Sequence, residues 1–356
     1  MRRAVRIKSS INKHKLAPIK EFAIEYNRCV NYFIRKLWSN NIMSGKFLDK
    51  EFTDVGNRFK LTARLIQCAG KQALQIVKSQ RKKSKRQQRM PRFKKLVTEL
   101  DTRFWEFSEV ENSFEWIKFH SGFKYYIPFN RTVMWNRWVD RGFTLSKSIR
   151  LIVKGSNLYI DFIFEKENPL LKTKGDIIGI DLGYVDIGRC SDGQILGQNT
   201  NTLIKSFDKW EKNTHKQITD YCYSELKKLD LTGIKQVTIE NLKSVKSRTR
   251  GKFSRKHNRR MSHWLYAKVT NWLERYCEEN GVRLEKVSPY KTSQYCRICN
   301  NWDRRNRNGV VFKCVHCGHT DNADTNASQN IRLLGLAGVY SLRSLQANLK
   351  VANKCP

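Results

Sequence analysis

Hydrophobic residues recur at helical spacing between residues 16 and 80. Two series follow one another, each with a repeat close to 3.6 residues. This period predicts two amphipathic helices, each with one face turned toward a core. The first series is Phe22, Ile24, Tyr26, Cys29, Val30, Phe33, Ile34 and Leu37, and the second is Leu61, Leu65, Ile66, Ala69, Ala73, Leu74 and Ile76.

From about residue 103 the hydrophobic period changes to two. Five segments alternate or are rich in β-branched and aromatic residues, and Ser-Gly, Asn and Gly-Ser-Asn turn signals separate them. They read FWEFSEV, FEWIKFH, KYYIPF, SIRLIVKG and LYIDFIFEKE. Residues 2–11 are also strand-like. We therefore predict a β-barrel-like unit whose first strand precedes the helices, which makes the helical region an insertion.

Short buried strands and helices alternate in the C-terminal half, after a linker-like stretch at 171–176. Buried strands are predicted at 177–183 (IIGIDLG), 236–242 (QVTIENL) and 282–287 (VRLEKV). Helices are predicted at 201–229 and from about Ser262 to Asn280, with Gly281 at the C-terminal cap. Strands that alternate with helices in this way predict an α/β domain with a mixed sheet.

The composition adds a strong positive charge to this picture. The 356 residues include 69 Lys and Arg against 32 Asp and Glu, a net charge of +37, and 40% of them are hydrophobic. A folded chain with this charge predicts a polyanionic partner, usually nucleic acid, and a membrane surface is the weaker alternative. No apolar run approaches the ~18 residues of a membrane span, and the N-terminus lacks the apolar stretch of a signal peptide. We therefore expect no membrane association.

Two runs, 81–95 and 243–260, each hold nine Lys or Arg and no acid. One such run alone is usually a solvated or flexible segment, but two runs beside aromatic-bearing folded segments favour phosphate binding. Such contacts position a nucleic acid without reading its sequence. The predicted contact residues are Arg81, Lys82, Lys83, Lys85, Arg86, Arg89, Arg248, Arg250, Lys252, Arg255, Lys256, Arg259 and Arg260.

Four of the ten cysteines form two CxxC pairs that are separated by fourteen residues. Each pair offers two thiolates from one tight turn, and two pairs complete the tetrahedral shell of zinc. Because four sulfur ligands leave no open position, we predict one structural zinc ion, with metal-free thiols or redox pairs as the alternative. We expect His316 and His319 at the surface or in contact with DNA. The four predicted ligands are Cys296, Cys299, Cys314 and Cys317.

Three acids occupy distinctive positions. Asp181 follows the apolar run IIGI, Glu240 follows QVTI, and Asp324 stands in DNADTNAS before a helical stretch at 329–334. A carboxylate at the end of a buried strand is desolvated, and a divalent cation commonly compensates for that cost. Each acid alone could be an ordinary strand-end residue or helix cap; together they could bind two magnesium ions that cleave phosphodiesters. Nearby acids rank as surface residues (Asp176, Asp186 and Asp192) or as an accessory ligand or cap (Asp321).

The segments GIDLG, IENL and TSQYCRIC…CVHCGHTDNADTNAS occur in this order. Together they resemble the RuvC-type nuclease of the TnpB family, transposon-associated RNA-guided DNA endonucleases that are related to compact type V CRISPR effectors. The resemblance covers roughly residues 175–332. It implies that Asp181, Glu240 and Asp324 are the magnesium-binding catalytic acids of an RNase H-like fold, and that the four cysteines build a zinc ribbon that touches target DNA.

Thr292, Ser293 and Gln294 match a family signature whose role the sequence does not give, with a polar contact at a turn or helix edge as the alternative.

The resemblance also implies a domain order. The parts expected are a wedge-like β-barrel (1–15 and 101–172), an inserted helical recognition lobe (16–100), the RuvC-like nuclease domain (173–294 and 320–334), the zinc ribbon (295–319) and a C-terminal tail (335–356).

The function implied is an RNA-guided endonuclease that cleaves target DNA with two magnesium ions. Its partners would be a guide RNA and a double-stranded DNA with a short adjacent recognition motif, in the cytoplasm of a prokaryotic cell, at the nucleoid. Three alternatives stay open: a compact type V CRISPR effector, a guided DNA-binding regulator without cleavage, and an unguided RuvC-like nuclease. The three acids favour an enzyme over a regulator, and the basic runs favour a guided enzyme.

Overall fold

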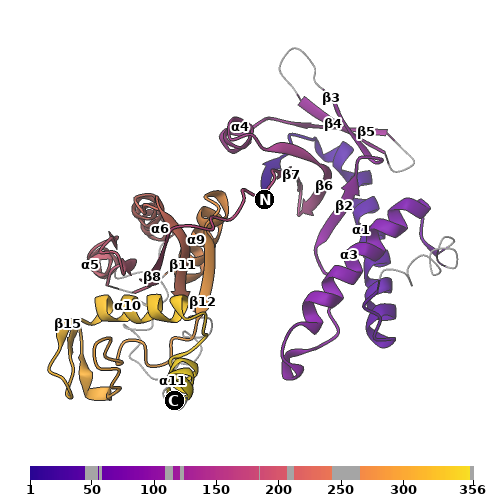
Figure 1. Ribbon diagram of the computed structural model, residues 1–356. Helices are drawn as coiled ribbons and strands as arrows, with labels where there is room; N and C mark the ends of the chain where they lie inside the picture. Colours follow the sequence, from indigo (N-terminus) through magenta and orange to yellow (C-terminus); the bar gives the residue numbers. More distant parts are fainter. Residues whose placement is uncertain are drawn as a thin grey trace. The chain divides into compact units, whose positions relative to one another are not determined.

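The computed structural model describes residues 1–44, 55, 58–108, 115–120, 124–183, 185–206, 212–242 and 265–352 (Figure 1). The chain divides into two compact units, Met1–Glu167 and Asn168–Pro356. The second basic run, 243–260, lies outside the described residues. Within the described part, no helix has the length and apolar character that crossing a bilayer requires.

The first unit contains a four-stranded antiparallel sheet in the order β1-β7-β6-β2. Its first strand in sequence pairs along its whole length with its last, from Arg2 opposite Glu165 to Lys8 opposite Tyr159. The helices therefore lie between paired strands in the sequence. The strands are β1 (Arg2–Lys8), β2 (Leu96–Asp101), β6 (Thr144–Lys154) and β7 (Asn157–Glu165).

A second antiparallel sheet in this unit has the order β3-β4-β5. Among the described strands, no ladder closes either sheet into the predicted barrel or joins one sheet to the other. Aromatic packing connects them instead, since Phe129 of β5 lies 4.7 Å from Phe162 of β7 between ring centroids, and Trp135 of α4 lies 4.9 Å from the same ring. The elements are β3 (Trp105–Ser108), β4 (Glu115–His120), β5 (Lys124–Phe129) and α4 (Val133–Asp140).

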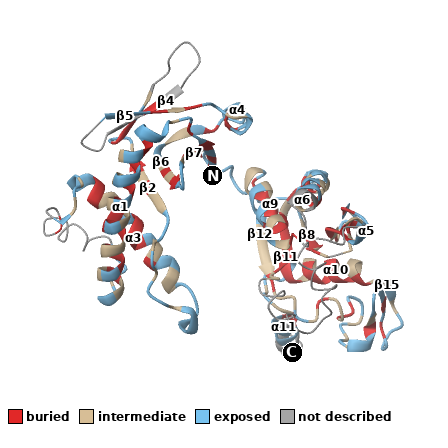
Figure 2. Cartoon of the chain, turned by 180° about the vertical axis from the view of Figure 1, so that it is seen from behind, coloured by how far each residue is buried: buried red, intermediate tan, exposed pale blue. Residues whose placement is uncertain are grey.

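The two predicted helices are present as α1 (Lys13–Ser39) and α3 (Ala63–Arg81). Each starts at a side-chain cap, because Asn12 accepts a hydrogen bond from the Lys15 amide and Thr62 accepts one from the Leu65 amide. Their apolar stripes pack together and form a core of their own (Figure 2). The helical region expected at 16–100 also holds strand β2 and the short 3₁₀ turn Lys85–Gln87.

The second unit is built on a five-stranded mixed sheet in the order β10-β9-β8-β11-β12. The first three strands in sequence are antiparallel, whereas β11 is parallel to both β8 and β12. The predicted mixed sheet is confirmed. The strands are β8 (Asp176–Asp181), β9 (Gly188–Cys190), β10 (Ile195–Leu196), β11 (Ile234–Glu240) and β12 (Arg283–Val287).

Helices lie on both faces of this sheet. Ile178 and Ile180 of β8 join the core that holds residues of α6 and α9, whereas the alternate residue Gly179 lies against α10. Gly281 ends α9 with φ +63°, as its predicted capping position requires. The helices are α5 (Thr200–Ser206), α6 (Lys212–Leu226), α9 (Tyr266–Glu279), α10 (Ala323–Leu336) and α11 (Leu342–Ala352).

A small sheet precedes α10 in the sequence. It consists of β13 (Arg307–Asn308), β14 (Val311–Lys313) and β15 (Thr320–Asn322), and a 3₁₀ turn at Arg304–Asn306 leads into it. β15 runs directly into α10, with Asn322 as both the last residue of the strand and the N-cap of the helix.

Candidate functional site

Two glycines allow α10 to lie directly on the sheet. A Cβ atom at Gly179 would come within 2.2 Å of the Ser328 carbonyl oxygen and 2.3 Å of the Arg332 nitrogen, both on α10. A Cβ at Gly335 of α10 would meet the Thr238 hydroxyl of β11 at 2.1 Å. Only glycine permits this approach, so the two positions fix the height of the helix above β8 and β11.

Asp181 and Glu240 end two neighbouring parallel strands. Ile180 of β8 pairs with Ile239 of β11. Asp181 is the residue after Ile180, and Glu240 is the residue after Ile239. Successive strand residues point to opposite faces, so Asp181 shares a face with Gly179, the residue that α10 covers. Glu240 shares that face for the same reason. The two carboxylates therefore lie at one edge of the sheet, beneath the α10 layer.

Asp324 enters from the first turn of α10, because this helix begins at Ala323, six residues before the helical stretch that the sequence predicts. Asn322 caps this helix by accepting hydrogen bonds from the amides of Asp324 and Thr325, at 3.0 and 3.3 Å. Asp324 and Ser328 are four residues apart and share one helix face. Since Ser328 lies over Gly179, Asp324 faces the sheet beside the two strand-end acids.

Arg307 of β13 reaches this acid cluster, although no sequence motif singled it out. Its guanidinium Nη2 donates to Asp324 Oδ1 at 2.9 Å. The side chains of Arg307 and Asp324 are 31% and 16% exposed, so the pair is largely shielded from water. Arg307 thus places a positive charge beside the three carboxylates.

Asp181 and Glu240 are both affected by burial and by the charge of Asp324. Burial raises the pKa of Asp181 well above its usual value, and the charges of Glu240 and Asp324 raise it further, whereas Arg307 acts in the opposite direction. Burial also raises the pKa of Glu240, against the hydrogen bond from Thr292 and the charge of Arg307. Carboxylates that are desolvated and repel one another require a compensating cation if all three are to be ionised.

Thr292 holds Glu240 in place. Its hydroxyl donates to Glu240 Oε1, and both groups are buried. The Asn330 amide of α10 in turn donates to the Thr292 and Tyr295 carbonyls, each at 2.8 Å. Gln294 accepts a hydrogen bond from the Trp302 indole at 3.3 Å. The signature at 292–294 therefore links the second acid to α10 and to the ribbon.

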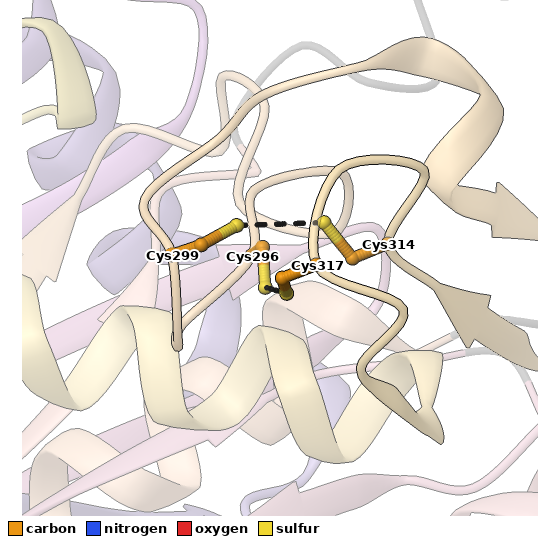
Figure 3. Close-up of side chains that lie close together, drawn as sticks. All are labelled: Cys296, Cys299, Cys314 and Cys317. Carbon is orange, nitrogen blue, oxygen red and sulfur yellow. Dashed lines mark hydrogen bonds between the residues drawn. The ribbon is translucent and has the colours of Figure 1, made fainter.

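The four cysteines form a closed cluster (Figure 3). The Sγ atoms of Cys296 and Cys317 are 3.7 Å apart and those of Cys299 and Cys314 are 3.5 Å apart, and all four lie within 4.8 Å of one another. Tetrahedral zinc with bonds of about 2.3 Å separates its sulfur ligands by about 3.8 Å, so the cluster fits the ion. Among the described residues this is the one group of three or more potential ligand residues as close as this; the three acids as a set are wider apart.

The backbone forms two equivalent knuckles around the cluster. Asn300 donates to the Cys296 carbonyl and Gly318 donates to the Cys314 carbonyl, both at 3.0 Å, and both donors have positive φ, +59° and +74°. Burial raises the pKa of Cys299 to about 12. For Cys314, backbone amides of Cys317 and His316 outweigh burial and lower the pKa to about 6. Thiols so close together cannot all ionise without a cation, which is consistent with a structural zinc ion.

Other expected residues have varied surroundings. Arg81 is engaged within the first unit, because its guanidinium lies 3.8 Å from the Trp38 ring centroid and donates to the Trp38 carbonyl. Lys82, Lys83, Lys85, Arg86 and Arg89 are exposed, and the seven predicted contacts from Arg248 to Arg260 lie outside the described residues.

The prediction of Asp186 as a surface residue is wrong. It is 4% exposed, and it accepts hydrogen bonds from Arg189 at 2.7 Å and from the Asn199 amide at 2.8 Å, so it organises the loop after β8. Asp321 pairs with Arg297 at 3.3 Å in the ribbon. His316 is exposed and His319 is half-buried.

Comparison with known proteins finds relatives that share these features. A family model described as "Cas12f1-like, TNB domain" matches residues 266–331, from α9 to α10. The CRISPR-associated endodeoxyribonuclease Cas12f1 of Sulfoacidibacillus thermotolerans is 39% identical over 77 residues, which is 21% of this chain and 18% of that protein. A TnpB-like protein of Methanocaldococcus jannaschii is 26% identical over 176 residues, 48% of this chain and 62% of that protein. The matches thus span less than two thirds of the length of either relative.

The fold agrees with these matches. A cryo-EM structure of a Cas12f1–sgRNA–target DNA complex contains a similar chain, with a TM-score of 0.54 and 17% identity over 88% of this chain and 80% of that one. The mixed α/β architecture therefore resembles that of the Cas12f1 chain. Together with the ordered acid and cysteine motifs, these similarities relate the C-terminal half of the chain to TnpB-like and Cas12f1 proteins.

Proposed function

We propose that this protein is a Mg²⁺-dependent DNA endonuclease that a bound RNA guides to its target. The observation that carries the proposal is the placement of Asp181, Glu240 and Asp324 at one edge of the sheet, where burial raises the pKa of Asp181 and of Glu240 and the charge of Asp324 raises both further. The strand order β10-β9-β8-β11-β12, with three antiparallel strands followed by two parallel ones, supports an RNase H-like nuclease domain.

The donor set fits magnesium. The three residues offer carboxylate oxygens, which are the ligands that this ion prefers, and no sulfur or imidazole ligand is part of the group. When bound, two such ions would activate water and stabilise the leaving oxygen of a phosphodiester. Asp181 and Glu240 would hold them from the rigid strand ends, and Asp324 would hold them from the helix N-terminus.

Two further residues would support these acids. Thr292 donates to Glu240 Oε1 and so fixes the orientation of that carboxylate, which leaves its other oxygen free of this bond. Arg307 neutralises Asp324 and stands where the charge of a scissile phosphate would be attracted. The protein thus supplies preorganised charge at the edge of the sheet.

The substrate would be a DNA strand opened by pairing with the guide. Family relatives named Cas12f1 are CRISPR-associated endodeoxyribonucleases, and one is described in complex with an sgRNA and target DNA. The net charge of +37 supports a large polyanionic partner. We favour a transposon-associated role, in which the first unit acts as wedge and recognition lobe beside a short duplex motif. A compact CRISPR effector is the alternative.

The test starts with sequencing the RNA that copurifies with the protein expressed beside its native flanking DNA. One abundant structured RNA with a variable end would then be used to assemble a cleavage assay with matched DNA and Mg²⁺. We expect Asp181→Ala, Glu240→Ala and Asp324→Ala to stop cutting without loss of RNA or target binding. Asp176→Ala, which removes the exposed acid at the other end of β8, is the matched control and should cut normally.

Other results would select other functions. Guided binding without metal-dependent cutting by the wild-type chain would identify a DNA-binding regulator. Cutting that needs the three acids but no specific RNA would identify an unguided nuclease.

A further inference from the structure

A basic cavity lies in the first unit, outside the acid and cysteine clusters. It has a volume of 840 Å³ and is lined by one face of α1, by the turn at 58–59 before α3 and by the irregular segment 90–94. Cavities of about 300–1,000 Å³ are typical of sites for small molecules and single nucleotides. The first basic run contributes the segment 90–94, which carries two of its cations, Arg92 and Lys94.

Side chains of α1 fix the segment 90–94 in place. Asn31 Nδ2 donates to the Phe93 carbonyl and the Phe93 amide donates to Asn31 Oδ1, both at 2.9 Å, in a reciprocal pair like that of a β-bridge. Asn27 Nδ2 donates to the carbonyls of Phe93 and Lys95 at 3.0 and 2.9 Å. This wall is therefore preformed and needs no ordering on binding.

Glu25 fixes the opposite wall. Its carboxylate accepts a hydrogen bond from the Lys60 amide at 3.2 Å and pairs with Arg28 at 2.7 Å. The turn at 58–60 is thus anchored to the same helix as the segment 90–94. Both walls are held at a fixed separation by α1.

The lining carries positive charge and no acid. Its cations are Arg28, Arg35, Arg58, Arg92 and Lys94, and all five are exposed. Within the part of the chain that the structure describes, only Arg28 has a carboxylate partner. Arginines in this number favour phosphate, which they bind through paired N–H groups.

The same cavity also has an apolar part. Phe59 and Phe93 line it with Met90, which is 50% exposed. Phe59 is supported from behind by Tyr32, with 5.8 Å between ring centroids. Aromatic and thioether side chains offer a base a surface to stack on, and a bare phosphate ion would have no use for them.

We propose that this cavity binds an unpaired nucleotide of a nucleic-acid strand, with the base against Phe59 and Met90 and the flanking phosphates on Arg35, Arg58 and Arg92. Because paired bases stay stacked inside a duplex, only an unpaired or extruded base can enter a recess of this kind. The strand belongs to the guide RNA or to opened target DNA. The inference rests on the proposed function for the source of that strand, but it concerns a site in the other unit.

The first test measures the phosphate contacts. Fluorescence anisotropy follows the binding of 12-nucleotide oligo(U), oligo(dT) and a duplex to the full chain across a salt series. We expect Arg35→Gln/Arg58→Gln/Arg92→Gln to weaken single-strand binding about tenfold and to reduce the salt slope by about 2, since each phosphate contact contributes about 0.7 for single strands. The matched control, Lys13→Gln/Lys20→Gln/Arg64→Gln, removes three exposed charges elsewhere on α1 and α3.

The second test measures the base contact. An oligonucleotide with one abasic position at its centre should bind the wild-type chain several-fold more weakly than the intact strand. Phe59→Leu/Met90→Ala should bind both strands equally, because the surface that discriminates them is gone. Thermal unfolding of each variant checks that the fold is retained, and Met90→Ala alone serves if the double variant unfolds.

The outcomes separate the two proposals. The cavity inference would be overturned if the triple variant at Arg35, Arg58 and Arg92 and its control lost the same single-strand affinity. It would also be overturned if the wild-type chain bound the abasic and intact strands equally. Either result would leave the proposal of guided cleavage intact. Cavity-dependent single-strand binding by a chain that shows no guided cutting would uphold the cavity and overturn the proposed function. Stronger effects on oligo(U) than on oligo(dT) would assign the cavity to the guide, and the reverse would assign it to DNA.

Discussion

The four cysteines and the three acids are both clusters of potential metal ligands in the second unit, but they are built differently. The cysteines come from two equivalent turns and bring their sulfurs within 4.8 Å of one another. The acids come from two strand ends and a helix, are wider apart as a set, and include a partner arginine. A closed set of soft ligands suits a structural ion, whereas an open set of oxygens leaves room for a substrate.

The largest effect should come from the acid cluster. Asp181→Asn keeps the shape of the side chain and removes its charge, so we expect guided cleavage to fall by roughly 10³-fold or more. Cleavage rates under single-turnover conditions would measure this loss. Activity within tenfold of wild type would show that the carboxylate is not part of the reaction.

The same variant should stabilise the chain in the absence of divalent ions. The pKa of folded Asp181 is raised, so ionising it costs folding free energy as the pH rises from the ordinary carboxyl value through the raised one. Without metal, we therefore expect the wild-type Tm to fall as the pH rises over that range, whereas the Tm of the Asn variant should not. At pH 7 the Tm of the variant should then be about 2–4 °C higher than that of the wild type. Added Mg²⁺ should raise the Tm of the wild type more than that of the variant.

In the cysteine cluster, removal of one ligand should destabilise the chain. Cys314→Ser should remove close to one equivalent of bound zinc and lower the Tm of the second unit, because zinc binding contributes to ribbon stability. Metal analysis of the purified protein measures the first effect. Cys277→Ser, at a buried cysteine outside the cluster, is the control and should keep its zinc. Unchanged zinc in Cys314→Ser would exclude the four-sulfur site.

A smaller effect is expected at Thr292. Thr292→Val removes the hydroxyl that donates to Glu240 while it keeps the side-chain volume. We expect a 10- to 100-fold loss of Mg²⁺ affinity or activity, the usual effect of a residue that orients a ligand. Thr292→Ser should restore most of it. Equal defects in both variants would indicate a packing role.

The smallest effects concern the approach of α10 to the sheet. Gly179→Ala places a methyl group against the backbone of α10, which should cost about 1–3 kcal/mol of unfolding free energy. Gly335→Ala meets the side chain of Thr238 first and should cost less. Chemical denaturation of both variants measures the two losses of unfolding free energy. A larger loss for Gly335→Ala would show that the contact of α10 with β11 is the less adaptable one.

Local patterns explain most of what the sequence predicted correctly. The spacing of the CxxC pairs encodes the sulfur cluster, and the apolar runs before Asp181 and Glu240 encode two buried strands whose parallel pairing brings both acids to one edge. The 3.6-residue period likewise predicted α1 and α3. The cysteine turns, the two helices and the two single strands each depend on residues that are close together in the chain, and the parallel order of the two strands follows from the helix between them.

Features that depend on distant contacts escaped prediction. Strand β2 (LVTELD) is defined by its pairing with β6, about fifty residues later, and one short alternation does not distinguish it from the end of a helix. Arg307 and Thr292 gain their roles only when the ribbon and α10 fold against the sheet. Asp186 looked like a turn residue because its partners, Arg189 and the Asn199 amide, come together around it only when the loop after β8 folds.

The direct passage from β15 into α10 has a mechanical consequence. Asn322 ends the strand and caps the helix, so no loop residue separates the ribbon from the turn that carries Asp324. A strand and a helix that are joined without a flexible residue between them move together. A nucleic-acid strand that displaces the ribbon would therefore also move the first turn of α10, and with it the carboxylate of Asp324.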